Sequence, residues 1–337
     1  MPELSFDNAA EWLSRHGLPF ENLRFAELGG GISNRVVLAE SSQITGEFRA
    51  VLKQSLGQLR TETGWYSDRE RIFREAAAMR WIAVKAGHGG FGGGKIPRIL
   101  FEDPASFTIA MEGAPAGAEM WKTLLFRGEH DRDVAWLTGA TLGSMISASL
   151  HNPEAERLFG DQTVFVQLRI DPYYRFTASC RPDAAEYIHS LISRSRMRRD
   201  CLVHGDWSPK NLLVDNVLQP ASLWVIDWEV VHYGDPSFED AFLLNHLLLK
   251  SIAMPQHRAH LAGLADSFVD GLVARLPSDG GWIVPAGLEH LPALLLARVE
   301  GKSPAEYLDA GMRRRAAALA LDLMRHPPAS VNEVFLR

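Results

Sequence analysis

The chain has few of the features that mark secreted or membrane-spanning proteins. Only two of its 337 residues are cysteines, Cys180 and Cys201, so no disulfide framework is available, and we expect two buried thiols in a reducing compartment. No apolar run approaches the roughly 20 residues that span a bilayer. The amino terminus has no basic stretch followed by an apolar core, so no signal peptide is predicted. These absences predict a cytoplasmic protein that does not bind a membrane.

An excess of basic residues is also missing. Lys and Arg number 35 against 41 Asp and Glu, which gives a net charge of −6. This balance argues against a nucleic acid as partner. The chain is 46% hydrophobic and 23% charged, an ordinary globular composition for one large domain or two lobes. Whether the protein is a monomer or a homodimer stays open.

The most informative stretch is residues 202–214, LVHGDWSPKNLLV. An apolar pair leads into His204, Gly205 and Asp206, and Asn211 precedes a second apolar run. A further apolar run, residues 223–226, ends on Asp227. Two acids and an amide at strand ends can hold a divalent cation and orient a hydroxyl group. The alternative is a polar turn between two strands.

A glycine-rich segment lies between two strands that are predicted near the start of the chain. It consists of Gly29, Gly30, Gly31, Ile32, Ser33 and Asn34. Glycines at such a position let the backbone approach a phosphate group closely, and Ser33 and Asn34 can add donors. A plain hairpin turn explains the segment equally well.

Lys53 and Glu75 are expected to form a buried pair. Lys53 ends the apolar strand predicted at 48–53, and Glu75 lies in the apolar stripe of a helix predicted from about residue 69 to 85, where Asp68 can cap it. A buried carboxylate without a partner is costly, so Lys53 is the natural candidate. Such a pair would point Lys53 at the phosphates of a nucleotide.

Two further glycine-rich segments follow. Residues 89–95 fit the first seven positions of the phosphate-binding motif G-x-x-x-x-G-K-[ST], but Ile96 has no hydroxyl and no strand precedes the segment. We therefore expect a flexible surface loop there.

The composition changes again after Met111, at Glu112 and Gly113. This second segment predicts a linker whose backbone could pair with an adenine edge, although an ordinary loop is about as good a reading.

The linker divides the chain into a first lobe, residues 1–112, and a mainly helical second lobe, residues 113–337. Residues 119–129 are predicted to be helical, whereas the aromatic segment 164–177 is predicted to be irregular. Asp240 is expected in the first turn of a helix, where its charge suits the helix dipole. It could also brace the loop of Asp206, but stabilisation of the dipole alone is the better explanation. Ser303 and Glu306, with Pro304 between them, fit a capping box that would start a last helix ending near residue 325.

The motif His204-Gly205-Asp206-x-x-x-x-Asn211, followed by Asp227 and Glu229, resembles the aminoglycoside phosphotransferase and choline kinase-like family. The order of the glycine segment, Lys53, Glu75 and Met111–Gly113 also matches, so the resemblance covers roughly residues 25–250. It implies an α+β, two-lobed protein-kinase-like fold, with a small antiparallel sheet and one helix in the first lobe and a mainly helical second lobe. It also implies an ATP- and Mg²⁺-dependent phosphotransferase that acts on a hydroxyl of a small molecule.

The resemblance assigns a role to each residue. Asp206 orients the substrate hydroxyl, and Asn211 and Asp227 hold Mg²⁺. Glu229 contacts a second metal ion or the substrate. Lys53, steadied by Glu75, contacts the α- and β-phosphates of ATP, the glycine segment covers the phosphates, and Met111, Glu112 and Gly113 take the adenine. His204 is expected to brace the loop through hydrogen bonds.

The sequence also departs from the protein kinases. The first lobe reads GGGISN rather than G-x-G-x-x-G, and no D-F-G or A-P-E pattern follows Asp227, which argues against protein substrates. An aminoglycoside, a sugar, an amino alcohol or methylthioribose would each fit as acceptor. Two alternatives remain, a catalytically inactive nucleotide-binding module of the same fold and a metal-dependent hydrolase.

Overall fold

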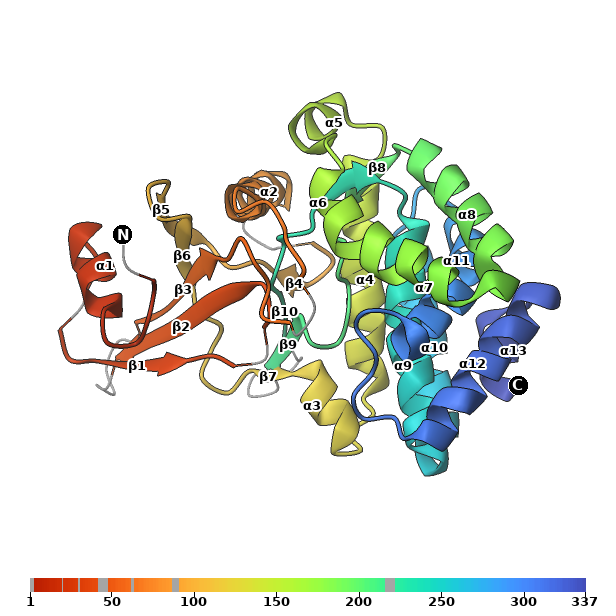
Figure 1. The fold of residues 1–337 in the computed structure, drawn as a ribbon. Coiled ribbons are helices and arrows are strands. Elements are labelled where there is room, and N and C mark those ends of the chain that lie inside the picture. The colour runs from red at the N-terminus through yellow and green to blue at the C-terminus, as the bar shows by residue number, and fades with distance from the viewer. Residues whose placement is uncertain are drawn as a thin grey trace. The chain divides into compact units, whose positions relative to one another are not determined.

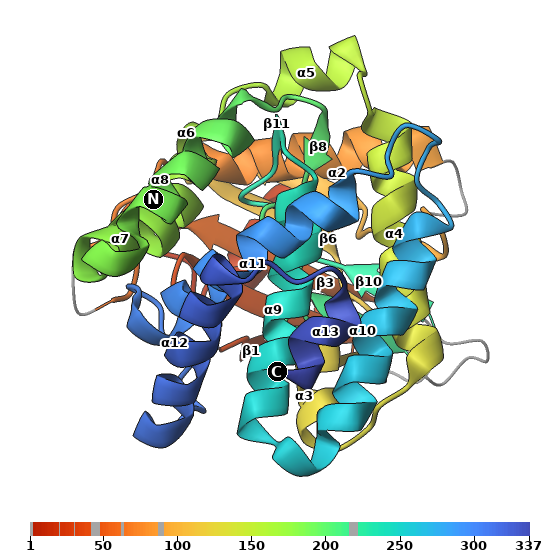
Figure 2. The same cartoon turned by 90° about the vertical axis from the view of Figure 1, so that its right-hand side faces the viewer.

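The computed structural model describes residues 3–19, 21–29, 31–41, 48–61, 64–86, 91–215 and 222–337. The chain forms two compact units (Figures 1 and 2). Unit 1 comprises Met1–His88 and Ile96–Ala118, and unit 2 comprises Gly89–Lys95 and Glu119–Arg337. Across the described ranges, no helix is both long enough and apolar enough to cross a membrane.

Unit 1 is built on an antiparallel sheet. Within its described residues five strands lie in the order β1-β2-β3-β6-β5. The strands are β1 (Leu23–Glu27), β2 (Asn34–Ser41), β3 (Arg49–Ser55), β5 (Ile99–Asp103) and β6 (Thr108–Glu112). The two helices described in this unit are α1 (Ala9–Arg15) and α2 (Arg71–Ala86). Trp12 and Leu13 of α1 share a core with Val37, Leu52 and Ala110 of the sheet, because the strands alternate apolar side chains toward α1.

Unit 2 combines short strands with many helices. Its described strands form one small sheet in the order β4-β10-β9-β7 and one pair, β11-β8. The strands are β4 (Gly94–Lys95), β7 (Glu119–Met120), β8 (Cys201–Val203), β9 (Leu212–Asp215), β10 (Ser222–Val225) and β11 (His232–Gly234). The antiparallel pair β9–β10 and strand β8 are the apolar runs that bracket the loop of Asp206 and Asn211.

The helices of unit 2 surround α9, which is buried along most of its length. Figure 2 shows α9 between α11 and α10, with α12 and α13 nearby. The helices are α3 (Trp121–Phe126), α4 (Arg132–Ser149), α5 (Pro153–Phe159), α6 (Thr163–Phe165), the π-helix η2 (Val166–Arg175), α7 (Phe176–Cys180), α8 (Pro182–Met197), α9 (Ser237–Ala253), the 3₁₀ turn η3 (Pro255–His257), α10 (Arg258–Val273), α11 (Ile283–Glu300), α12 (Ala310–Arg325) and α13 (Val331–Leu336).

The expectation of an irregular segment at 164–177 is wrong. The chain is continuously helical there, through α6, η2 and α7. Pro172 lies inside η2, where a proline lacks the N–H that an α-helix would use, and the wider turn of a π-helix tolerates this defect. The helix directs Arg169, Tyr173 and Tyr174 inward, so this segment contributes buried side chains to unit 2.

Two other expectations about helices are also wrong. The helix expected at 119–129 is limited to α3, after the short strand β7. The helix expected from Ser303 begins instead at α12, whose N-cap Asp309 accepts a hydrogen bond from the Met312 N–H at 2.7 Å. Ser303 binds the guanidinium of Arg298. A capping-box pattern is a local signal, and here a contact with α11 overrides it.

The segment 89–95 is not the surface loop that we expected, as far as it is described. Gly89 and Gly90 lie outside the described residues. Gly94 and Lys95 form β4, which pairs in parallel with β10. Gly92 has φ +56°, and a Cβ there would lie 2.4 Å from the carbonyl oxygen of Ala140. Its glycines therefore serve close packing on α4.

Surface properties also differ from expectation at one cysteine. Cys201 is buried, as expected, but Cys180 is exposed.

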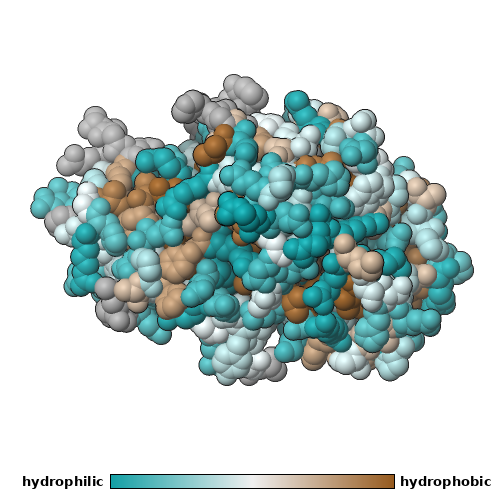
Figure 3. Space-filling model, turned by 90° about the horizontal axis from the view of Figure 1, so that it is seen from above, coloured by the Kyte–Doolittle hydropathy of each residue, from teal (hydrophilic) through white to brown (hydrophobic). Residues whose placement is uncertain are grey.

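Figure 3 shows that the face seen from above is largely hydrophilic and that hydrophobic side chains form small, separate patches on it.

Candidate active site

The loop that carries Asp206 is held by its own histidine. His204 is fully buried, its Nδ1 accepts the Asp206 N–H at 3.2 Å, and its Nε2 lies 3.0 Å from the Ile226 carbonyl. Burial lowers the pKa of His204 to about 4, so the ring is neutral near pH 7 and carries its proton on Nε2. This geometry confirms that His204 braces the loop by hydrogen bonds.

Gly205 is required by the shape of this loop. Its φ is +80°, and an added Cβ would lie 2.7 Å from both Cγ1 and the carbonyl oxygen of Val230. A larger residue would therefore be strained and would also clash. The glycine lets the chain turn sharply between β8 and Asp206.

Glu239 fixes the same loop from α9, and sequence reasoning missed it. Its two carboxyl oxygens accept the N–H groups of His204 at 3.1 Å and Gly205 at 2.8 Å. Burial raises the pKa of Glu239 to about 8, although the two backbone bonds act in the opposite direction. The only sequence signal was an acid in the first turn of a very apolar helix.

Asp206 is buried and contacts two cations through one oxygen. Oδ2 lies 2.8 Å from Nζ of Lys210 and 3.1 Å from a guanidinium nitrogen of Arg169. Oδ1 has no protein partner among the described residues. Burial alone would raise the pKa of Asp206, but Lys210 and Arg169 outweigh burial and hold that pKa below its usual range. The carboxylate is therefore ionised, with one oxygen held and one available.

Arg169 was not identified from the sequence, because it lies in the segment that was expected to be irregular. It extends from η2, and its Nε donates to the Gly205 carbonyl at 2.6 Å. Burial opposes its charged form, but the negative charges of Asp206, Glu229 and Asp227 outweigh burial and raise the pKa of Arg169. One guanidinium thus binds the loop backbone and balances the acids around it.

Asn211 precedes β9 and Asp227 follows β10, so both lie at the same end of this antiparallel pair. The Asn211 amide nitrogen donates to the Asp206 backbone carbonyl at 2.9 Å, and its own backbone carbonyl accepts the Ile226 N–H at 3.0 Å. The amide oxygen of Asn211 is not used in either bond. Asp227 follows β10 with φ +67°, a conformation that Asp and Asn tolerate better than most residues. Glu229, two residues later, is buried. Asn211, Asp227 and Glu229 therefore supply amide and carboxylate oxygens in the same part of unit 2 as Asp206.

Unit 1 confirms the expected pair of Lys53 and Glu75. Nζ of Lys53, on β3, lies 2.7 and 3.0 Å from the two carboxyl oxygens of Glu75, on α2. The Lys53 side chain is 6% exposed and that of Glu75 is fully buried. The helical period placed Glu75 on the inward face of α2, so the pair follows from the sequence pattern.

The segment after the glycines is anchored by a residue that the sequence reasoning did not single out. Arg71, at the start of α2, is buried and donates to the carbonyl oxygens of Ser33 at 2.6 Å and Leu56 at 3.0 Å. The Asn34 amide donates to the Ser33 hydroxyl at 3.0 Å. Gly30 lies outside the described residues. A Cβ on Gly29 or Gly31 would meet no atom of the other described residues within 4 Å.

The expected adenine segment is Met111, Glu112 and Gly113, at the end of β6. The Glu112 N–H donates to the Arg98 carbonyl at 2.8 Å, and the Gly113 N–H donates to the Arg49 carbonyl at 2.9 Å. These two donors are therefore already used within unit 1. Any base contact at this segment has to use other backbone groups.

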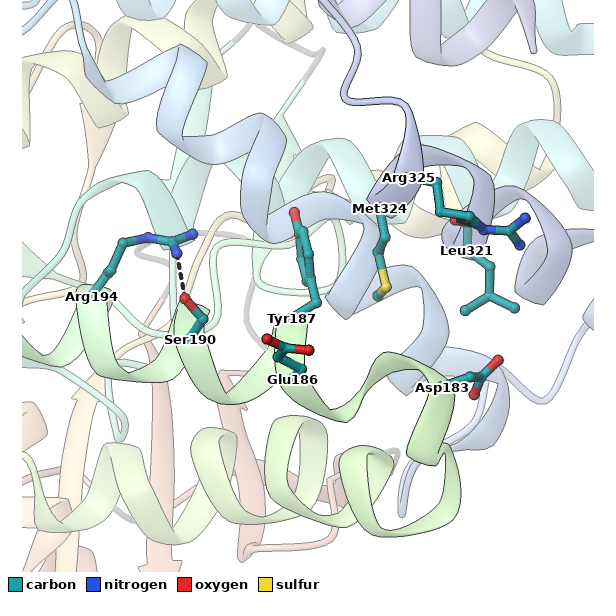
Figure 4. Close-up of a pocket in the computed structure, with 8 residues that line it drawn as sticks. All are labelled: Asp183, Glu186, Tyr187, Ser190, Arg194, Leu321, Met324 and Arg325. Carbon is teal, nitrogen blue, oxygen red and sulfur yellow. Dashed lines mark hydrogen bonds between the residues drawn. The ribbon is translucent and has the colours of Figure 1, made fainter.

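A hollow elsewhere in unit 2 does not include these residues. Figure 4 shows it between α8 and α12, lined by Tyr187, Arg194 and Met324 among others, with a volume of about 540 Å³. Arg194 donates to the Ser190 hydroxyl at 2.7 Å along the same helix. None of the residues expected at the active site lines this hollow.

Comparison with known proteins gives related chains. A family model described as "Phosphotransferase enzyme family" matches residues 24–266. The chain is 23% identical over 246 residues to 4-hydroxytryptamine kinase of Psilocybe cyanescens, and the match covers 66% of this chain and 66%, just under two thirds, of that relative.

Solved structures of other proteins share the fold, two kinases among them. One is an amicoumacin kinase in complex with AMP-PNP, Ca²⁺ and Ami, with a TM-score of 0.57, 13% identity, and coverage of 94% of this chain and 93% of that chain. The other is a microcompartment-associated aminopropanol kinase, with a TM-score of 0.55, 19% identity, and coverage of 95% and 97%. The predicted α+β, protein-kinase-like fold is confirmed by these likenesses.

Proposed function

Because this chain belongs to the phosphotransferase enzyme family, we propose that it is an ATP- and Mg²⁺-dependent kinase that phosphorylates a hydroxyl group of a small molecule. The observation that carries the proposal is the state of Asp206. Its Oδ2 is held by Lys210 and Arg169, and its Oδ1 has no protein partner among the described residues. An ionised oxygen with no partner, on a rigid loop, suits a hydroxyl that must be oriented.

In the proposed reaction, the substrate hydroxyl donates its hydrogen bond to Oδ1 of Asp206. The hydroxyl oxygen forms a bond to the γ-phosphorus, and the bond from that phosphorus to the bridging oxygen of ATP breaks. The bond electrons leave with ADP, and the hydroxyl proton passes to Asp206. Phosphoryl transfer depends mostly on positioning and charge neutralisation, and Lys210 and Arg169 supply positive charge beside Asp206.

The proposed metal ligands are Asn211, Asp227 and Glu229. Their amide and carboxylate oxygens are the donors that Mg²⁺ prefers, and the amide oxygen of Asn211 is not used in its bonds to the loop. When bound, Mg²⁺ neutralises charge on the phosphate oxygens of ATP. The second role that we considered for Glu229, contact with the substrate, remains an alternative.

The proposed nucleotide contacts lie in unit 1. Lys53, held by Glu75, would contact the α- and β-phosphates, and Gly29–Asn34 would cover the phosphates. Gly29 and Gly31 support this role, because neither has a positive φ and a Cβ on either would meet no atom of the other described residues within 4 Å. Packing of the described residues gives no reason for glycine there, whereas close approach of a phosphate does. We extend the proposal to the lobes, with residues 1–112 binding the nucleotide and 113–337 carrying catalysis.

The test is transfer of label from γ-labelled ATP to a panel of aminoglycosides, sugars and amino alcohols. Asp206→Asn is expected to lower kcat by about 10²- to 10⁴-fold, while the exposed control Asp183→Asn keeps the wild-type rate. Binding of Mg-ATP without transfer to any alcohol would favour the inactive nucleotide-binding module. An Asp206→Asn enzyme with the wild-type rate would refute the assignment of Asp206. We also propose a cytoplasmic monomer or homodimer that binds no nucleic acid.

A further inference from the structure

Lys250 is a buried lysine of unit 2 that has no acidic partner within the described residues. It lies on α9 and is 1% exposed. Its ammonium donates to the His246 carbonyl at 3.3 Å. The ammonium also lies over the rings of Phe126 and Tyr307, 5.4 and 5.8 Å from their centroids. A buried charge without a counter-ion is costly, so its retention here calls for a reason.

Two more cations accompany Lys250, namely Lys122 of α3 and Arg298 of α11. Burial, together with these two charges, lowers the pKa of Lys250 to about 7. Arg298 binds Ser303 and lies 3.5 Å from the Tyr173 hydroxyl, while its Nε has no hydrogen-bond partner in the described part of the chain. Neither Lys122 nor Arg298 forms an ion pair there. We refer to Lys122, Lys250 and Arg298 as the cationic cluster.

The cationic cluster adjoins the loop of Asp206. The backbone N–H of Lys122 donates to the carbonyl of Pro209, within that loop, at 2.8 Å. Glu239, His246 and Lys250 are spaced by seven and four residues, so they share one face of α9. Glu239 binds the loop at one end of this face, and Lys250 lies toward the other end.

Tyr173 links the two groups of charges directly. The guanidinium of Arg169, which contacts Asp206 at 3.1 Å, lies 5.6 Å from the centroid of the Tyr173 ring. The guanidinium of Arg298 lies 5.9 Å from the same centroid. Positive charges and aromatic rings in contact therefore lead from Asp206 to Arg298, and the charge of Arg298 in turn acts on Lys250.

We infer that the alcohol phosphorylated by this protein carries a negative charge, and that the cationic cluster binds its carboxylate while Asp206 orients its hydroxyl. This inference rests on the proposed function. An acceptor with an ammonium group would place it beside three cations that no described carboxylate neutralises. An anion would instead supply the missing counter-charge to Lys250.

The spacing also sets the size of the acceptor. Glu239 and Lys250 are eleven residues apart, about 16 Å along the axis of α9, and helical side chains lean toward the N-terminus. The carboxylate of the acceptor therefore lies several carbons from its hydroxyl. We expect an elongated hydroxy acid rather than the shortest ones.

The test compares ω-hydroxy acids with ω-amino alcohols of equal chain length, from 4-hydroxybutanoate and 4-aminobutanol to the eight-carbon pair. With γ-labelled ATP, the hydroxy acid should be favoured in kcat/KM by about tenfold or more, the factor that corresponds to 1.4 kcal/mol. Equal transfer, or a preference for the amino alcohol, would overturn this inference and leave the proposed kinase function intact.

Lys250→Met shows whether the cluster causes the preference. The variant should raise KM for the hydroxy acid and bring the ratio close to one, with KM for ATP unchanged. Lys85→Met is the matched control, since Lys85 is an exposed lysine over the Trp81 ring in unit 1, and it should keep the wild-type ratio. An increase in KM for ATP alone would mean that the cluster serves the nucleotide, which overturns the inference.

A binding measurement makes the test independent of turnover. NMR of the protein made with lysine labelled with ¹³C at Cε should show that a hydroxy acid of the right length raises the pKa of Lys250, because the carboxylate stabilises the ammonium. The amino alcohol of equal length should not. Absence of this shift with every acid in the series overturns the inference. A shift without transfer of label would contradict the proposed function and leave an anion site.

Discussion

Each unit buries a lysine, and the two lysines differ in whether an acidic side chain pairs with them. In unit 1, Lys53 contacts both oxygens of Glu75 on the neighbouring helix. In unit 2, Lys250 is buried at least as deeply and has no acidic partner within the described residues. A buried ion pair in which both partners belong to the protein holds its cation in one place. An unpaired buried cation destabilises the free protein and favours an anion that comes from outside.

The largest effect on stability is expected for Lys53→Met. The variant leaves Glu75 buried and unpaired, which should lower the free energy of unfolding by about 3–5 kcal/mol. Urea unfolding at pH 7 measures it. The double variant Lys53→Met/Glu75→Met should recover much of the loss, because both buried charges are gone.

Arg194→Met is a matched control for this pair. Arg194 contacts Glu289 at 2.6 Å, but both side chains are half exposed, and exposed pairs contribute little. An equal loss in Arg194→Met, or a double variant as unstable as Lys53→Met alone, would contradict the view that the pair in unit 1 is closed and buried.

The next largest effect on stability is expected for Glu239→Gln in unit 2, the unit that buries the unpaired Lys250. An amide can accept only one of the two loop N–H groups that Glu239 accepts, and the other is left unpaired at a cost of about 1–3 kcal/mol. Urea unfolding of the variant beside the exposed control Glu186→Gln checks this loss. A variant as stable as wild type at pH 5 would contradict it.

The pH dependence of this loss has a definite sign. The pKa of Glu239 rises from 4.5 to about 8 on folding, so its contribution to stability is complete below pH 4.5 and is lost as the pH rises through 8. The gap between wild type and Glu239→Gln should therefore narrow from pH 5 to pH 9. A gap that stays constant or widens would show that Glu239 is ionised when folded.

The sequence predicted those parts of the site that depend on a regular period. Glu75 was found because a helix repeats its inward face every three to four residues, and its pairing with Lys53 is confirmed. The loop of Asp206 and Asn211 was found because apolar runs bracket it, and β8, β9 and β10 lie where those runs are. These signals are local, and the tertiary structure agrees with them.

The residues that were missed depend on contacts between distant segments. Arg169 reaches Asp206 from a π-helix, which has no pattern that a search for α-helices would find. Glu239 seemed to be an ordinary acid in a first helical turn, and only the packing of α9 against the loop gives it two donors. Lys250 was not identified from the sequence, because no pattern within α9 shows that the charged side chains near it, Lys122 and Arg298, are cations on other helices.

A smaller effect, and of opposite sign, is expected for Lys250→Met without ligand. The pKa of Lys250 is lowered from 10.5 to about 7, so its cost to stability is absent above about pH 10.5, builds up as the pH falls from 10.5 to 7, and is complete below 7. The methionine variant should be more stable than wild type at pH 7 by about 1 kcal/mol, and the difference should vanish near pH 10.5. Urea unfolding at both values checks this, and a less stable variant at pH 7 would show that Lys250 is already compensated.

The smallest effect is expected for Asp240→Asn, beside Glu239. Asp240 is fully buried, and neither carboxyl oxygen has a hydrogen-bond partner among the described residues. We expected it to act through the helix dipole, but burial raises its pKa well above the usual value, which favours the uncharged acid and opposes such an effect. An amide has the same shape as the uncharged acid that burial favours, so the free energy of unfolding at pH 7 should change by less than about 0.5 kcal/mol. A loss as large as that of Glu239→Gln would mean that Asp240 is ionised and holds a positive partner, and unit 2 would then contain a closed pair like that of unit 1.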